Sequence, residues 1–138
     1  MKLFVDTSAF LKRYVDEAGS ERIDALCAEA EALGLSVLVY PESIAAFCRL
    51  RREGRLSAPA YRRLRRDLEA DLAAAALLPL EADALGSAVD ALEAAPLRAA
   101  DAIHIGAALS WGAERFVSAD RRQLDAAEAV GLSVEIIA

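Results

Sequence analysis

Short apolar runs alternate along the chain with longer segments in which hydrophobic residues recur every three or four positions. The apolar runs are KLFVD (residues 2–6), LSVLVY (35–40), RFVS (115–118) and LSVEII (132–137), and each predicts a β-strand. The segments between them predict amphipathic helices. Because strands that alternate with helices are typical of a parallel sheet, we expect one α/β domain over residues 1–138. Its central, mostly parallel sheet should have four or five strands, flanked by about seven helices.

Residues at the ends of the polar segments predict where individual helices begin and end. A brief helix is expected directly after the first strand, and Ser20 is a suitable N-cap for a longer one that stops at Gly34. Pro41 is expected to open the next helix because its fixed φ and missing N–H suit the first turn. Further helices are expected from Ser57 and over residues 81–96, 99–111 and 120–131. Their apolar stripes, among them Leu85, Val89 and Leu92, are expected to face the core.

Composition narrows the class of protein. Of the 138 residues, 56% are hydrophobic and only 6% aromatic, so the core must consist mainly of Ala, Leu, Val and Ile. This composition is that of a folded domain rather than of a disordered or rod-like protein. The longest apolar run, residues 72–80, is shorter than the roughly 20 residues that a membrane span needs. Because the sequence shows no secretory signal, we expect a cytoplasmic protein. Cys27 and Cys48 lack the spacing of metal ligands, so we expect both to be reduced thiols.

The distribution of charge changes what the net charge of −6 implies. Taken alone, an acidic balance argues against a nucleic-acid partner, because Lys and Arg drive phosphate binding. Residues 49–66, however, hold eight arginines and one glutamate, a local charge of +7 that leaves −13 for the rest of the chain. We favour RNA phosphates or a partner protein as the target of this segment over an idle surface. This basic patch consists of Arg49, Arg51, Arg52, Arg55, Arg62, Arg63, Arg65 and Arg66.

Four carboxylates stand apart from the other acids because each lies among apolar residues at a strand exit or a helix start. Asp6 ends the first strand, Glu42 follows the second, and Asp120 follows RFVS by one residue. Asp101 opens the apolar segment DAIHIGAAL. Functional side chains of open parallel sheets converge beyond the carboxyl ends of the strands, so we expect these four to meet there. A helix-start acid can also be a plain N-cap, which explains any one of them better than the whole set.

Clustered carboxylates repel one another and need a cation to stay ionised. No Lys or Arg is adjacent in sequence to Asp6 or Asp101. Oxygen ligands of this kind suit Mg²⁺ or Mn²⁺, which can activate a water and stabilise the leaving oxygen of a phosphodiester. The residues therefore predict metal-dependent hydrolysis of phosphodiester bonds.

Four motifs follow one another in order over essentially the whole chain. They are FVDTSAFLK, Glu42 after the second strand, DAIHIGAAL, and FVSADRRQL followed by AVGLSVEII. Together they resemble the PIN-domain ribonucleases, and in particular the VapC-type toxins of toxin–antitoxin pairs. The resemblance implies a Mg²⁺- or Mn²⁺-dependent endoribonuclease that forms homodimers and is held inactive by a cognate antitoxin. It implies a metal site of Asp6, Glu42, Asp101 and Asp120, with supporting hydroxyls from Thr7, Ser8 and Ser118.

Two other classes of function are open. The first is a non-cleaving PIN-like module whose acidic groove captures a basic peptide. The second is a haloacid-dehalogenase-like phosphatase or a receiver domain. The phosphatase pattern, however, needs an Asp where this chain has Ser8, and a receiver needs an acid pair near its first strand.

Three aromatic or imidazole side chains are expected to have structural roles. His104 is expected to be packed or at the surface, Trp111 to anchor a helix end, and Tyr61 to lie in the core or an interface.

Overall fold

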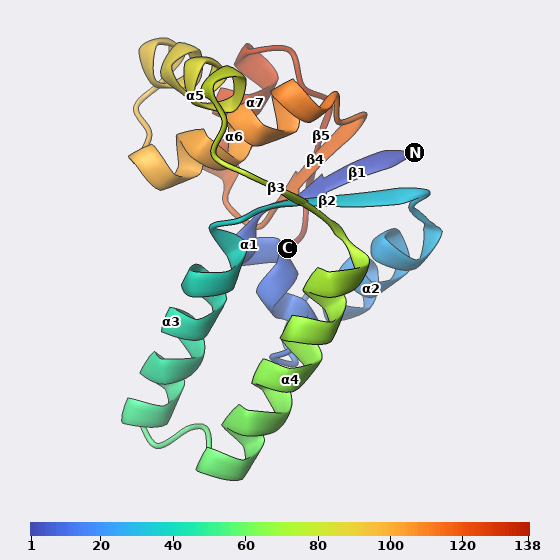
Figure 1. Ribbon diagram of the computed structural model, residues 1–138, viewed down its shortest axis with the longest axis vertical. Helices are drawn as coiled ribbons and strands as arrows, with labels where there is room; N and C mark the ends of the chain where they lie inside the picture. Colours follow the sequence, from blue (N-terminus) through green and yellow to red (C-terminus); the bar gives the residue numbers. More distant parts are fainter.

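The computed structural model describes all 138 residues and places a five-stranded sheet between two layers of helices (Figure 1). The strand order is β3-β2-β1-β4-β5, and every neighbouring pair is parallel, which confirms the predicted α/β class. The strands are β1 (Lys2–Val5), β2 (Ala32–Ser36), β3 (Ala76–Leu78), β4 (Arg115–Ser118) and β5 (Val134–Ile136). The helices are α1 (Thr7–Phe10), the 3₁₀ helix η1 (Leu11–Arg13), α2 (Ser20–Glu29), α3 (Val39–Arg52), α4 (Ala58–Ala74), α5 (Ala82–Ala94), α6 (Ala99–Trp111) and α7 (Arg121–Ala129). None of these helices combines the length and the apolar character that crossing a membrane requires.

Alternating side chains of the central strands divide the core into two halves. Leu3 and Val5 of β1 pack with residues of α1 to α4 on one face of the sheet. Phe4, between them, packs with α5 to α7 on the other face and stacks on Phe116 of β4, with ring centroids 5.5 Å apart. Cys27 lies at the margin of the first half, and neither cysteine forms a disulfide. Both faces of the central strands are therefore covered, as expected for a parallel sheet.

The carboxyl ends of three neighbouring strands carry the segments that hold the predicted site. Because β1 lies between β2 and β4, the chain segments that leave these strands start side by side. The backbone N–H of Asp6 donates to the carbonyl oxygen of Val117 in β4 at 3.0 Å, which fixes the exit of β1 against β4. Helix α3 follows β2, and α7 follows β4 with Asp120 as its N-cap.

The second strand lies earlier in the chain than predicted. Helix α2 ends at Glu29 and not at Gly34, which lies inside β2. A Cβ on Gly34 would lie 2.6 Å from Cζ3 of Trp111, so the glycine makes room for the indole that anchors the end of α6. Helix α3 begins at Val39, and Pro41 is its third residue rather than its first. The run LSVLVY thus contains both the end of a strand and the first helical residues, a change that hydrophobicity alone does not mark.

A short edge strand, β3, follows α4 and was not among the predicted strands. It pairs with β2 in the register Gly34 to Ala76, and Val37 N–H extends the pairing by donating to Leu78 O at 3.0 Å. Its residues continue the Ala- and Leu-rich sequence of α4. The pattern of hydrophobic residues therefore gives no sign of the change to extended backbone at Ala75. With this strand the sheet has five members, at the upper end of the predicted range.

Helix α5 turns a different face to the core from the one predicted. Its large apolar residues point to solvent: Leu85, Val89 and Leu92 are 42%, 51% and 39% exposed. Its buried residues are Ala84, Ala88 and Ala91. These alanines lie against α6 at Gly106, where a Cβ would come within 2.2 Å of the backbone oxygen of Ala84. Small residues allow the two helices to approach closely. This contact leaves no room in the core for the stripe of larger residues.

Helices α3 and α4 form a hairpin that projects away from the sheet (Figure 1). Helix α4 begins directly after Ser57, as predicted, and Ser57 caps it with its Oγ accepting from the backbone N–H of Ala60 at 3.2 Å. Leu68 and Leu72 of α4 are buried, and Tyr61 is half-buried beneath the guanidinium of Arg51, 5.1 Å from the ring centroid. The eight arginines of the basic patch are all exposed on this hairpin.

Candidate active site

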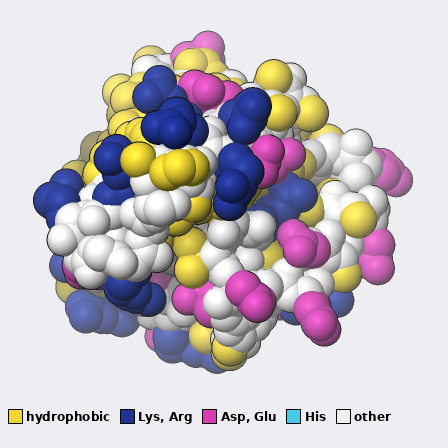
Figure 2. Space-filling view, turned by 90° about the horizontal axis from the view of Figure 1, so that it is seen from below, with side chains coloured by type: hydrophobic (Ala, Val, Ile, Leu, Met, Phe, Trp, Pro, Cys, Tyr) yellow, Lys and Arg dark blue, Asp and Glu magenta, His cyan; other side chains and the backbone are white.

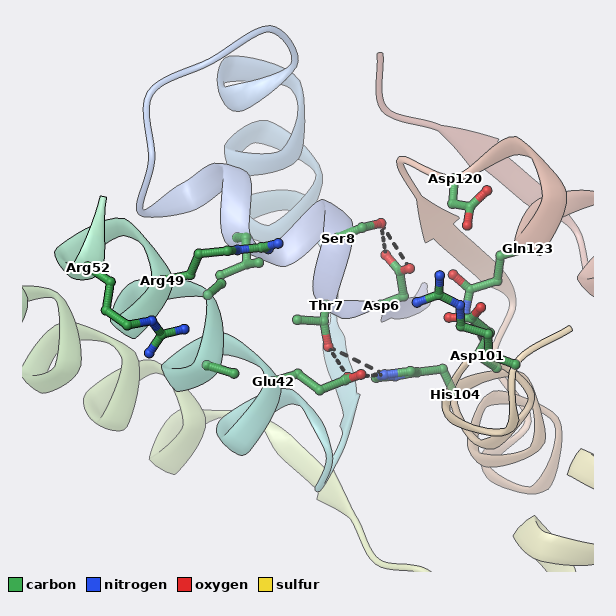
Figure 3. A pocket seen from close by; sticks show the side chains of 14 residues that line it. Asp6, Thr7, Ser8, Glu42, Arg49, Arg52, Asp101, His104, Asp120 and Gln123 are labelled. Carbon is green, nitrogen blue, oxygen red and sulfur yellow. Dashed lines mark hydrogen bonds and ion pairs between the residues drawn. The ribbon is translucent and has the colours of Figure 1, made fainter. Parts of the chain in front are cut away.

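The four predicted carboxylates line one hollow of about 610 Å³ at the carboxyl edge of the sheet (Figure 3). They come from four separate segments: the end of β1 for Asp6, the first turn of α3 for Glu42, the first turn of α6 for Asp101, and the N-cap of α7 for Asp120. Thr7 and Ser8 line the same hollow, and Ser118 lies buried beneath it. The predicted site residues, scattered over the sequence, are thus brought together.

Asp6 is the most deeply buried of the four acids, with 4% of its surface exposed. Its Oδ1 caps α1 by accepting from Ala9 N–H at 3.0 Å, and the hydroxyls of Ser8 and Ser118 donate to the carboxylate at 2.9 Å. Burial raises the pKa of Asp6 even though these hydrogen bonds favour the ionised form. No Lys or Arg forms an ion pair with it. A cation in the hollow would therefore relieve an unfavourable buried charge.

Glu42 is held by two hydrogen bonds to a single oxygen. Thr7 Oγ1 donates to Oε1 at 2.7 Å, and His104 Nε2 lies 2.6 Å from the same atom. Burial on its own would raise the pKa of Glu42, but the bonds from His104 and Thr7 outweigh it and the pKa is lowered. The carboxylate is therefore ionised at neutral pH. Its second oxygen, Oε2, accepts no hydrogen bond from the protein and is available to a ligand.

His104 lies under the hollow with 2% of its surface exposed, so the expectation of a packed histidine is confirmed. Its contact with Glu42 was not predicted. Nε2 must carry a proton, because the carboxylate of Glu42 can only accept. The other ring nitrogen, Nδ1, is buried and has no hydrogen-bond partner. The spacing of three residues from Asp101, which places both on one side of α6, indicated that His104 faces the site but not that it contacts Glu42.

Asp101 and Asp120 face the hollow from the starts of two helices. The side chain of Asp120 accepts from Arg122 N–H at 3.0 Å and so caps α7. Burial and the negative charge of Asp120 raise the pKa of Asp101. Asp6 and Asp120 are therefore both helix N-caps, the alternative explanation for a single acid at a helix start. Both also line the hollow, so the two roles are compatible.

Gln123 of α7 is a site residue that the sequence did not reveal. It is 1% exposed and lines the hollow. Its Nε2 donates to the backbone oxygen of Asp101 at 3.2 Å, and its Oε1 lies 3.1 Å from Ser118 Oγ. The side chain therefore ties α7 to α6 and β4 directly behind the acids. A polar residue on the buried stripe of an otherwise amphipathic helix was the only signal for it.

The donor set fits Mg²⁺ or Mn²⁺, which prefer oxygen ligands. No three acidic, histidine or cysteine side chains converge tightly enough to form a closed cage. Mg²⁺ does not need one, since it is commonly bound by one or two carboxylates and keeps waters or substrate phosphates as its other ligands. An open hollow lined by four carboxylates, two of them with raised pKa values, suits an ion held in this way.

Only part of the basic patch reaches the hollow. Arg49 and Arg52 line it from α3, and Arg98, which lies outside the patch, lines it from the start of α6. The remaining patch arginines do not line the hollow, and two of them are paired with acids: Arg55 with Glu53 at 3.6 Å and Arg65 with Glu69 at 3.5 Å. Figure 2 looks onto the end where α3 and α4 project and shows many Lys and Arg side chains gathered on this face.

A sequence model of the PIN domain matches residues 3–129. The chain belongs to the PIN-domain family. This PIN domain is also 35% identical over 134 residues to Ribonuclease VapC45 and to Ribonuclease VapC49, from two strains of Mycobacterium tuberculosis. Each match covers 96% of this chain and 93% of the relative. The resemblance to VapC-type toxins inferred from the motifs is therefore confirmed.

A solved structure supports the same assignment of the fold. A toxin–antitoxin complex from Klebsiella pneumoniae contains a chain that superposes with a TM-score of 0.71 at 14% sequence identity. The match covers 100% of this PIN domain and 98% of that chain. At this level of identity the likeness shows a shared fold, which extends over the full length of both chains.

Proposed function

We propose that this PIN domain is a Mg²⁺- or Mn²⁺-dependent endoribonuclease and the toxin of a toxin–antitoxin pair. The observation that carries the proposal is the convergence of Asp6, Glu42, Asp101 and Asp120 on one hollow with no Lys or Arg paired to any of them. Both VapC45 and VapC49 are ribonucleases by name, which supports RNA as the substrate.

Each residue of the hollow has a role that follows from its contacts. Asp6, Asp101 and Glu42 would hold the ion, and Asp120 would support a second ion or orient the attacking water. Bound there, the ion would lower the pKa of a water and stabilise the negative charge on the leaving oxygen. The hydroxyls of Ser8 and Ser118 orient Asp6, and Thr7 and His104 fix Oε1 of Glu42.

The arginines at the rim supply the positive charge that the acids lack. Arg49 and Arg52 lie on one helix of the hollow and are exposed to solvent. Guanidinium groups bind phosphate oxygens with two parallel hydrogen bonds, so these side chains can hold an RNA backbone beside the ion. The basic patch thereby offsets the unfavourable net charge of −6 where the substrate enters.

We also propose two protein partners. The chain seen in the Klebsiella pneumoniae complex is part of a toxin–antitoxin pair, which supports a cognate antitoxin for this protein. The acidic hollow offers such a partner a place for a basic side chain. The exposed leucine and valine stripe of α5 supports a homodimer, because it leaves an apolar surface without cover.

The replacement Asp101→Asn tests the proposed reaction. Purified protein is incubated with a panel of RNAs in Mn²⁺, with Asp90→Asn as a control because Asp90 is an exposed acid of α5 far from the hollow. Since the ion contributes several kcal/mol of transition-state stabilisation, we expect Asp101→Asn to cleave about 100-fold more slowly or worse, and EDTA to stop the wild type. Asp90→Asn should cleave like the wild type.

Two outcomes would contradict this function. Cleavage that survives EDTA, or that survives Asp101→Asn at full rate, would exclude a mechanism based on the ion. Wild-type protein that cuts no RNA in Mn²⁺, yet binds a short basic peptide tightly, would instead identify a non-cleaving module that uses the acidic hollow for protein recognition.

A further inference from the structure

A second hollow continues from the active site, on the side of Asp101 and Asp120 where the chain enters α6. It has a volume of about 500 Å³. Arg98, Asp101 and Asp120 line both hollows, so the two adjoin at these residues and together make a groove across the acids. The second hollow is lined by Pro96, Leu97, Arg98, Asp101, Asp120 and Arg122.

The chemistry of the second hollow favours an anion. It lies at the start of α6, whose N-cap is Arg98, and beside Arg122, the second residue of α7, whose N-terminus is already capped by Asp120. The N-terminus of a helix carries a partial positive charge and unpaired N–H groups, and the N-cap of α6 provides no side-chain hydrogen bond to them. Arg98 and Arg122 are both exposed. Neither has a carboxylate within 4.0 Å, so their guanidinium groups are free for a ligand.

Arginines therefore flank the acids on both sides of the groove. Arg49 and Arg52 line the first hollow from α3, and Arg122 lines only the second. The negative charges between them, Asp101 and Asp120, belong to the proposed metal site, and a divalent ion bound there would offset part of this charge. A nucleic-acid strand that follows the groove would pass the arginines of α3, then the ion, and then Arg122.

We propose that the second hollow binds a backbone phosphate of the RNA strand next to the scissile bond, with Arg122 and Arg98 as its contacts. The inference rests on the proposed ribonuclease function and adds the path of the substrate. Phosphates on one side of the cut lie at Arg49 and Arg52, and those on the other side lie at Arg98 and Arg122. A strand held on both sides of the ion is cut internally. An acidic peptide fits less well, because only a nucleic-acid strand supplies a further phosphate to the ion between the two hollows.

The replacement Arg122→Gln tests the subsite, and Arg121→Gln is the matched control. Arg121 is the neighbouring exposed arginine at the start of α7 but lines neither hollow. The probe is a fluorescein-labelled single-stranded oligoribonucleotide of about 12 nucleotides, a length that spans several phosphate contacts. Its affinity is followed by fluorescence anisotropy over a range of salt concentrations, with Ca²⁺ in place of Mg²⁺ to limit turnover.

The salt dependence gives the decisive number. Each phosphate contact on a single strand contributes about 0.7 to the slope of log K against log salt, so Arg122→Gln should reduce the slope by about 0.7. Affinity at moderate salt should fall about three- to fivefold, the range of an exposed ion pair. Arg122→Lys should keep the wild-type slope because it keeps the charge, and Arg121→Gln should not change the slope.

Cleavage kinetics give a second measurement. With cleavable oligonucleotides in Mn²⁺, Arg122→Gln should raise KM only for those extended on one side of the cut.

The outcomes separate a failure of the subsite from a failure of the function. Wild-type cleavage with identical slopes for Arg122→Gln and Arg121→Gln would overturn the subsite and leave the ribonuclease intact. The subsite would also be overturned if Arg122→Gln lost the same affinity for oligonucleotides extended on either side of the cut. It would be overturned as well if the variant lost affinity for an acidic peptide but not for RNA. A wild type that neither binds nor cuts RNA in Mn²⁺ would overturn both proposals.

Discussion

At the scale of single residues, the contact with His104 helps to keep Glu42 ionised in the candidate site. The hydrogen bond of 2.6 Å between them is largely buried and, with that from Thr7, keeps the pKa of Glu42 below its ordinary value. It also occupies Oε1 and leaves Oε2 as the oxygen that faces a ligand. His104 thus orients a residue of the site without needing to touch the substrate.

The replacements His104→Leu and His104→Gln separate this orienting role from simple packing. Leucine fills the space but cannot donate, whereas the amide of glutamine can still donate to Glu42. Loss of a partner that orients a metal ligand typically costs 10- to 100-fold in metal affinity, so we expect that loss for His104→Leu and a smaller one for His104→Gln. Isothermal titration with Mn²⁺ measures the affinity, and the melting temperature shows that both variants are folded. Wild-type affinity in His104→Leu would contradict the role.

The raised pKa of Asp101 predicts how stability depends on pH when the metal is absent. A carboxyl group whose pKa is raised on folding stabilises the protein fully below the ordinary value of 3.8, and this contribution is lost as pH rises through the raised value. In EDTA, wild type should therefore lose stability relative to Asp101→Asn as pH rises above 3.8. At neutral pH the variant should melt at a higher temperature than wild type, and this difference should shrink as pH falls towards 3.8, measured by circular dichroism. A difference in melting temperature that is independent of pH would contradict this reading.

At the scale of elements, the contact between α5 and α6 explains why the leucine stripe lies outside. Alanines on α5 and Gly106 on α6 bring the two backbones close, because no side chain separates them. Larger residues on this face would force the helices apart. The sequence pattern predicted that the stripe of Leu85, Val89 and Leu92 faces the core, whereas close packing buries the stripe of small residues instead.

Replacing two glycines with alanine tests this contact. Gly106→Ala adds a methyl group that would lie 2.2 Å from Ala84 O, so we expect a loss of about 1–3 kcal/mol in the free energy of unfolding. Gly86→Ala, on the open side of α5 with nothing within 4 Å, is the control and should stabilise by about 0.5–1 kcal/mol through helix propensity. Urea unfolding of both variants measures the difference. Equal stability of the two variants would show that the helices have room to separate.

The same reasoning shows how much of the fold the sequence could predict. Periodicity located β1, β4, β5 and most helices, because each begins where polarity changes sharply. It misplaced β2 and missed β3, because Gly34 and the Ala-rich end of α4 owe their conformation to distant partners such as Trp111. In the site, the acids were predictable because a carboxylate among apolar residues is unusual. Gln123 and the contact of His104 were not, since a buried polar residue is defined by neighbours from other elements.

At the scale of the whole molecule, apolar and charged surfaces are separated. Five of the six large hydrophobic residues that are exposed fall between Leu77 and Leu92, on β3, α5 and the turn between them. The arginines lie on the hairpin of α3 and α4, which Figure 1 shows projecting from the other side of the sheet. Two separate surfaces are compatible with the two proposed partners, a second copy on the apolar one and RNA on the basic one.

The replacement Val89→Lys tests the proposed dimer. Val89 lies in the middle of the apolar stripe and is 51% exposed, so a lysine there should not disturb the fold of the monomer. We expect light scattering after size-exclusion chromatography to give the mass of a dimer for wild type and of a monomer for the variant. Ala94→Lys, which adds the same charge on the far side of α5, should remain a dimer. A monomeric wild type would contradict the proposal.

The capping role of Asp6 has a genetic consequence. Its carboxylate starts α1 and binds hydroxyls from two segments, so replacing it damages both the fold and the chemistry. Asp101 has no such bond to its side chain and can be replaced at little cost to folding. In a selection for cells that escape the proposed activity, Asp101 alleles should leave abundant folded protein that still binds the proposed antitoxin. Asp6 alleles should leave less, so inactivating mutations at the two positions would differ in dominance although they abolish the same reaction.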